Sequence, residues 1–156
     1  MTEGFTTIRV FDAPRERVWR EWTEPEAFAD WFGGAAIEIP LSTVSIDLRE
    51  GGRLRATMLQ GQLEIHWKGE FQEVVEPKRL VFTLSDQPGE DRYELVIVDL
   101  RDLGDGRTEM RLEQRGHMAA AEYLRAQRGW GRFFDRMAER LASGPSPSIP
   151  PEIGGR

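Results

Sequence analysis

The chain has 156 residues, enough for one domain with a sizeable core, and it contains no cysteine, which excludes disulfides, thiolate metal sites and cysteine nucleophiles. Its formal net charge of −6 argues against a nucleic-acid partner, because phosphate contacts need a concentrated positive surface. The sequence has no apolar run of about 20 residues, which a membrane span would need, and no signal-peptide layout at its start, so we expect a cytoplasmic protein.

The first part of the chain predicts a strand followed by a helix. Residues 5–11 alternate in character and place Ile8 and Val10 on one face of a strand. Pro14 then suits an early position in a helix. The apolar stripe of that helix would consist of Val18, Trp19 and Trp22.

A second short helix should follow at once. Thr23-Glu24-Pro25-Glu26 has the form of a capping box, with threonine at the N-cap and glutamate three residues later. The helix would end at Gly33-Gly34. Its apolar residues would be Phe28, Trp31 and Phe32.

From about residue 43 to residue 115 the sequence predicts six strands. Apolar and polar residues alternate with a period of two, which predicts a sheet covered on one side only. Short turn signals separate the strands and predict antiparallel neighbours. These signals are Gly51-Gly52, Gly61, Pro77, Pro88-Gly89 and Gly104-Asp105-Gly106. In the last strand, 107–115, the side chains facing away from water are Thr108, Met110, Leu112 and Gln114.

Strand 93–102 departs from this alternation, because it is apolar on both faces. The residues concerned are Leu95, Val96, Ile97 and Val98. They could form an exposed patch or a dimer seam, and burial at the centre of the sheet explains them equally well.

The last element is a helix from roughly residue 119 to residue 142. Gly129 and Gly131 flank Trp130, and each costs about 1 kcal/mol relative to alanine inside a helix. Such a pair predicts close backbone approach or a kink. The apolar stripe of the helix is Tyr123, Trp130, Phe134, Met137 and Leu141.

Residues 144–156 are rich in Pro, Gly and Ser and should form a flexible tail, which leaves residues 1–143 as one domain.

These elements predict an α+β domain. A curved antiparallel sheet of about seven strands would bury its apolar face against the long C-terminal helix. A strongly twisted sheet curves around such a helix without closing on it completely. The space left between them would be an internal pocket, open near Trp130 and solid toward residues 137–141.

Short motifs run along most of the chain in a characteristic order. They are Ala13-Pro14, Val18-Trp19, Trp22-Thr23-Glu24-Pro25, Trp31-Phe32-Gly33, Asp47-Leu48-Arg49-Glu50-Gly51-Gly52, Gly69-Glu70-Phe71, Glu73-Val74, Pro77-Lys78-Arg79-Leu80-Val81-Phe82-Thr83, Gly106-Arg107-Thr108 and Gly129-Trp130. With them, residues 5–142 resemble the START-like superfamily of helix-grip domains, and within it the homologues of the activator of the ninety-kilodalton heat-shock chaperone ATPase. The resemblance implies a helix-grip fold with a hydrophobic cavity between the sheet and the long helix.

The candidate ligand-binding residues would line that cavity. The helix would contribute Tyr123, Gln127, Trp130 and Phe134, and the sheet Leu54, Met58, Trp67, Phe71, Phe82, Met110 and Leu112, while Trp31 and Phe32 would close one end. We expect no cofactor, and no metal site because suitable ligands do not cluster in the sequence.

No catalytic residue is predicted. The chain lacks Gly-x-Ser-x-Gly, His-Glu-x-x-His and a phosphate-binding glycine loop. His66 lies in the polar phase of its strand, and His117 precedes the long helix, where it could reach the pocket mouth.

Three acidic or basic side chains have two possible interpretations each. Glu73 falls in the apolar phase of its strand, so it either points inward as a buried carboxylate or is turned out by a β-bulge at Glu73-Val74, which we favour. Asp47 and Arg49 could bind a substrate, but a pair on the surface is the better interpretation.

The leading functional hypothesis is non-catalytic binding of a small apolar molecule, such as a lipid, polyketide or aromatic metabolite. The first alternative is an enzyme of the polyketide cyclase or aromatase type, which polar groups converging in the pocket would favour. The second is a chaperone-regulating module, which an exposed apolar patch would favour. The eukaryotic activators carry a separate chaperone-binding domain for which this chain has no room. We expect a monomer or a weak homodimer.

Overall fold

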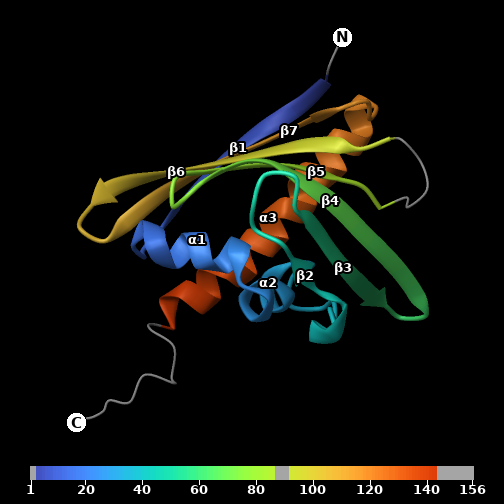
Figure 1. The fold of residues 1–156 in the computed structure, drawn as a ribbon, viewed down its shortest axis with the longest axis horizontal. Helices are drawn as coiled ribbons and strands as arrows, with labels where there is room; N and C mark the ends of the chain where they lie inside the picture. Colours follow the sequence, from blue (N-terminus) through green and yellow to red (C-terminus); the bar gives the residue numbers. More distant parts are fainter. Residues whose placement is uncertain (1–2, 87–91, 144–156) are drawn as a thin grey trace.

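The computed structural model describes residues 3–86 and 92–143 (Figure 1). Seven strands form one antiparallel sheet in the order β1-β7-β6-β5-β4-β3-β2. The helices lie together on one face of this curved sheet (Figure 1). The elements are β1 (Glu3–Phe11), α1 (Arg15–Thr23), α2 (Pro25–Trp31), a 3-10 turn (Leu41–Thr43), β2 (Ser45–Ile46), β3 (Arg53–Gln60), β4 (Leu63–Val75), β5 (Arg79–Leu84), β6 (Glu94–Gly104), β7 (Arg107–Gly116) and α3 (Ala120–Ala142).

The predicted helix-grip architecture is confirmed, with two short helices after the first strand and a long helix at the end. The predicted tail, residues 144–156, lies outside the described residues. In the part of the chain that the structure describes, none of the helices combines the length and the apolar character that crossing a membrane requires.

The predicted capping box at Thr23 is wrong. Thr23 is the last residue of α1, and its hydroxyl donates to the Trp19 carbonyl at 3.0 Å. Glu24 occupies the N-cap of α2 in an extended conformation, with Pro25 as the first helical residue. Proline forces the residue before it out of the helical region, so the break falls one residue later than the motif predicted.

β1 presents two of its apolar residues, Ile8 and Val10, to the outside of the sheet, whereas Phe11 is buried in the core. Ile8 is 56% exposed and Val10 is 50% exposed, so the shared face predicted for them is the uncovered one. Arg9 faces α3 instead, where its Nη1 donates to the Gly131 carbonyl at 3.2 Å and its Nη2 pairs with Asp135. A polar link therefore joins this edge of the sheet to α3.

The core is filled by aromatic rings that α1 and α2 bring under the sheet. Trp31 is fully buried, and its ring centroid lies 4.7 Å from that of Trp22. Trp31 Nε1 also donates to the Glu21 carbonyl at 2.6 Å, which satisfies its polar atom. Phe134 of α3 meets both tryptophans at centroid distances of 6.2 Å. Because these rings occupy the space between the middle of α3 and the sheet, the contact there is solid.

β6 lies at the centre of the sheet, third in the strand order, between β7 and β5. Val96, Ile97 and Val98 are all buried. Burial at the centre of the sheet therefore explains why this strand is apolar on both faces, and these three residues form no exposed patch.

The last turns of α3 are tied to α1 and α2 by two arginines. Arg140 Nε donates to Glu21 Oε1 at 2.7 Å, and Arg140 also pairs with Asp30, which Arg136 reaches at 2.9 Å. Burial alone would raise the pKa of the Asp30 carboxyl, but the hydrogen bonds and charges of Arg136 and Arg140 outweigh it and hold the pKa below its ordinary value. This network fixes the helices on one another.

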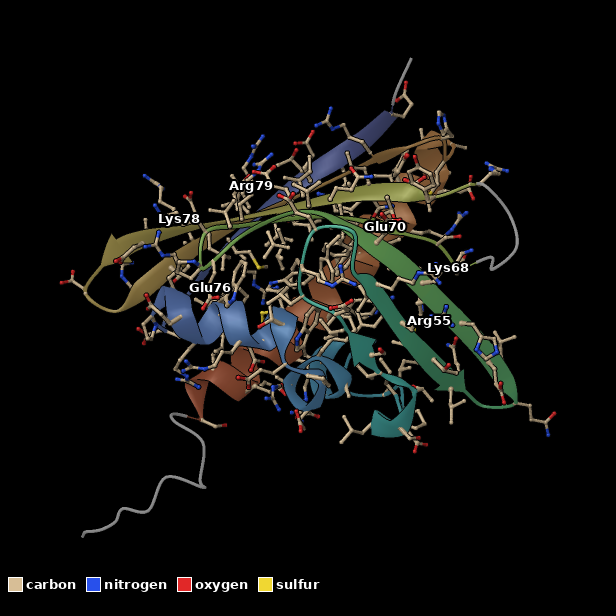
Figure 2. All side chains as sticks on the ribbon, in the orientation of Figure 1. Arg55, Lys68, Glu70, Glu76, Lys78 and Arg79 are labelled. Atoms are coloured by element: carbon tan, nitrogen blue, oxygen red, sulfur yellow. The ribbon has the colours of Figure 1, made fainter. Side chains whose placement is uncertain are left out.

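The outer face of the sheet carries charged side chains. Arg55, Lys68 and Glu70 are exposed along β3 and β4 (Figure 2). Arg79, at the start of β5, donates to Asp99 at 2.7 Å. The apolar candidates for a site therefore lie on the opposite face, toward α3.

Candidate functional site

A pocket of about 320 Å³ opens between the first half of α3 and the sheet. It lies beside Trp130, nearer the start of α3 than the arginine network described above. Its lining combines aromatic and polar side chains: Phe32, Trp67, Leu84, Ser85, Asp86, Arg92, Tyr93, Glu94, Gln114, Met118, Glu122, Ala126, Gly129, Trp130 and Phe133.

A chain of hydrogen bonds fixes the polar wall of the pocket. Trp130 Nε1 donates to Gln114 Oε1 at 2.9 Å, and Gln114 Nε2 donates to Glu94 Oε1 at 3.1 Å. The Tyr123 hydroxyl donates to the same carboxylate oxygen at 2.7 Å. The Met118 N–H donates to the Tyr123 hydroxyl at 3.3 Å. Residues of β6, β7 and α3 are thus held in one arrangement.

Tyr123 keeps its proton in this arrangement. Burial raises the pKa of its phenol to about 12, and the hydrogen bond to the Glu94 carboxylate adds to the rise. The phenol is therefore a hydrogen-bond donor at neutral pH, and its role is to orient Glu94.

Trp67 contributes its ring to the wall. Its Nε1 is buried and has no hydrogen-bond partner within the described residues. Buried indole N–H groups normally find an acceptor, so this one is an exception within the core.

The structure places the sequence-predicted site residues in four environments. Phe32, Trp67 and Trp130 line the pocket, and Tyr123 supports it through Glu94. Met58 lines a separate groove beside Gly33, and Gln127 is half-buried on α3 outside the pocket lining. The others pack in the core and are absent from the pocket lining: Trp31, Leu54, Phe71, Phe82, Met110, Leu112 and Phe134.

Sequence reasoning missed the central polar residues, Glu94 and Gln114. Gln114 did carry a signal, because it is a polar residue in the inward-facing phase of strand 107–115, where it is 5% exposed. A buried amide needs partners, and Glu94 and Trp130 provide them.

Glu73, Asp47 and Arg49, for which we favoured a position on the surface, do lie there. A register shift does turn Glu73 outward, but it lies between Phe71 and Glu73, just before the predicted position at Glu73-Val74. Glu73 accepts from Arg79 Nε at 3.2 Å. Asp47 and Arg49 form the predicted surface pair.

The two histidines are exposed. His66 contacts Thr57 and Glu64 on the outer hairpin. His117 is absent from the pocket lining, but its backbone N–H donates to Glu94 Oε2 at 3.2 Å. No three potential metal ligands are grouped within residues 3–86 and 92–143.

The predicted close backbone approach at the two glycines of α3 is wrong. A Cβ atom added at Gly131 would meet nothing within 4 Å, and one at Gly129 would meet only Arg132 Nη2 at 3.9 Å. Gly129 borders the pocket, whereas Gly131 does not. The space beside Gly129 is therefore part of the pocket.

Comparison with known families agrees with the sheet, the long helix and the order of elements. A family model described as "Activator of Hsp90 ATPase homolog 1-like protein" matches residues 12–142. The chain belongs to this family. As an AHSA1-like protein it shares its fold with several solved structures, whereas no curated protein matches it.

Three of these structures illustrate the structural similarity, the sequence identity and the share of each chain that is matched. Protein CV1439 from Chromobacterium violaceum has a TM-score of 0.78 and 24% identity, over 87% of this chain and 94% of that one. Protein NE0264 from Nitrosomonas europaea has a TM-score of 0.76 and 25% identity, over 90% and 94%. The AHSA1 protein from Silicibacter pomeroyi has a TM-score of 0.78 and 19% identity, over 90% and 98%. The AHSA1-like fold is thus retained at low identity.

Proposed function

We propose that this AHSA1-like chain binds a small, mostly apolar molecule with one polar end in the pocket beside α3, without catalysing a reaction. The observation that carries the proposal is the composition of the pocket, in which aromatic walls surround a few fixed polar groups. Small-molecule sites have this composition, because apolar area supplies affinity and the polar groups orient the ligand. The volume of about 320 Å³ is sufficient for a compact ligand.

The walls suit a flat apolar body. Phe32, Trp67, Phe133 and Trp130 line the pocket and contact one another, with the Trp130 and Phe133 ring centroids 5.5 Å apart.

An enzyme of the cyclase type is the second candidate, because polar groups converge on the pocket. Glu94 and Tyr123 would be its proton-transfer pair. A phenol with a pKa of about 12 is a weak acid near neutral pH, where an effective general acid needs a pKa close to the operating pH. Glu94 already accepts three hydrogen bonds. The raised pKa of Tyr123 and the three hydrogen bonds to Glu94 favour ligand binding over catalysis.

Gly129 and Gly131 provide a matched pair for testing the proposal. Each alanine substitution should raise the free energy of unfolding by about 1 kcal/mol, because alanine is the better helix former. Only Gly129→Ala adds a methyl group beside the pocket. We expect the neutral fluorophore N-phenyl-1-naphthylamine to bind the wild type, Gly131→Ala to bind it equally, and Gly129→Ala to bind it about tenfold more weakly.

Fluorescence titration would measure the affinities, and urea unfolding would measure the stabilities. Absence of binding to the wild type, or an equal loss in both variants, would contradict binding in this pocket. Turnover of an added polyketide chain that Glu94→Gln abolishes would favour the cyclase alternative.

A further inference from the structure

We infer that the ligand of this pocket is an organic cation: an amine on an aromatic or apolar body, with its charged group beside Glu94. The inference rests on the proposed function, since it names the class of ligand for the same pocket. It follows from the charge that the pocket leaves uncompensated and from the groups that surround this charge.

Among the residues that the structure describes, those that hold the Glu94 carboxylate are all neutral donors. Oε1 accepts from the Tyr123 hydroxyl at 2.7 Å and from Gln114 Nε2 at 3.1 Å, and Oε2 accepts from the His117 N–H at 3.2 Å. Within the described residues, no lysine, arginine or histidine side chain forms an ion pair with it. A carboxylate has about four acceptor positions, so one remains for a ligand.

The other charged residues of the pocket lining are mostly negative, as Glu94 is. Asp86 and Glu122 accompany Glu94 on the wall, and Arg92 is the basic residue among the lining residues that the structure describes. The chain as a whole has a formal net charge of −6. A cationic group would be attracted to this pocket, whereas a carboxylate or phosphate would be repelled by Glu94.

The neighbouring aromatic rings suit a cation as well. Tyr93, Trp67 and Trp130 line the pocket together with Glu94, and indole faces attract ammonium groups. Gln114 bonds to both Trp130 and Glu94, so one side chain fixes the ring and the carboxylate relative to each other. The pocket thus offers an anion and aromatic faces in one fixed arrangement.

Three probes with one naphthalene body separate charge from apolar contact. They are 2-naphthylmethylamine, 2-naphthylmethanol and 2-naphthoate, a cation, a neutral molecule and an anion. By titration calorimetry we expect the amine to bind the wild type about tenfold more tightly than the alcohol, because its ammonium group forms an ion pair with Glu94 that the neutral alcohol cannot form. The carboxylate should bind most weakly.

Glu94→Gln should lower the affinity for the amine to that of the alcohol and leave the alcohol within about twofold, because it removes the charge and keeps the size. Glu109 is half-buried on the outer face of β7, where it pairs with Arg101, and it is absent from the pocket lining. Glu109→Gln removes the same charge there and serves as the control, with the preference for the amine retained. If Glu94→Gln does not fold, the order of the three affinities for the wild type tests the cation inference without it.

Equal affinities for the three probes, tightest binding of the carboxylate, or a preference for the amine that survives Glu94→Gln would overturn the cation inference and leave the binding function standing. Failure of the amine to bind while N-phenyl-1-naphthylamine binds would overturn it too. Failure of all four molecules to bind the wild type would instead remove the proposed function.

Discussion

Replacing Met137 with alanine should lower the free energy of unfolding by about 2–5 kcal/mol, because the side chain is fully buried and its removal leaves a cavity that the aromatic core cannot close. Leu124 on the same helix is 56% exposed, so Leu124→Ala should change stability by no more than about 0.5 kcal/mol. Urea unfolding of the two variants measures the difference. Equal small effects would mean that the contact between α3 and the sheet is loose at Met137.

Replacing Arg140 with methionine should cost about 3 kcal/mol. Its guanidinium bonds both oxygens of Glu21, at 2.7 Å and 3.2 Å, and the Glu21 side chain is only 9% exposed. Loss of one partner of a buried ion pair leaves an uncompensated charge, which destabilises more than loss of both. The double variant Glu21→Gln with Arg140→Met should therefore recover a large part of the loss.

Arg136 offers the matched control for this prediction. It pairs with Asp30 and Glu139, whose side chains are 42% and 66% exposed. Ion pairs of this kind contribute about 0–1 kcal/mol, so Arg136→Met should be far milder than Arg140→Met. Thermal and urea unfolding of the four proteins tests both statements, and similar losses in Arg136→Met and Arg140→Met would show that burial of Glu21 does not matter.

The fold could be predicted because its signals are local. Periodicity gave a final helix of residues 119–142, and α3 spans Ala120–Ala142. Predictions failed or stayed incomplete where an adjacent residue or the packing of another element determines the local structure. The predicted N-cap at Thr23 is wrong because Pro25 forces Glu24 out of the helical region. Ile8 and Val10 share a face as predicted, but the pattern within residues 5–11 did not say which face the helices would cover.

The pocket could be predicted only in part. Aromatic spacing identified Trp67 and Trp130, but the polar wall depends on residues far apart in the chain. Glu94 is 20 residues before Gln114 and 29 residues before Tyr123. Only the pairing of β6 with β7 and the docking of α3 bring them together. Gln114, a polar residue in an inward position, indicated that the wall would not be purely apolar.

The pairing of β1 with β7 has a consequence for how the molecule is made. Residues 3–11 have their strand partner only in residues 108–116, and α3 follows later still. At about 5–20 residues per second, a ribosome needs roughly 5–20 s to synthesise the intervening hundred residues. During that interval the nascent chain can form its local hairpins and place α1 and α2 against Phe82, but α3 is still missing from that face of the sheet. Folding should therefore complete in one late step, when β7 and α3 emerge, and the unfinished chain should be the form of this protein most prone to aggregation.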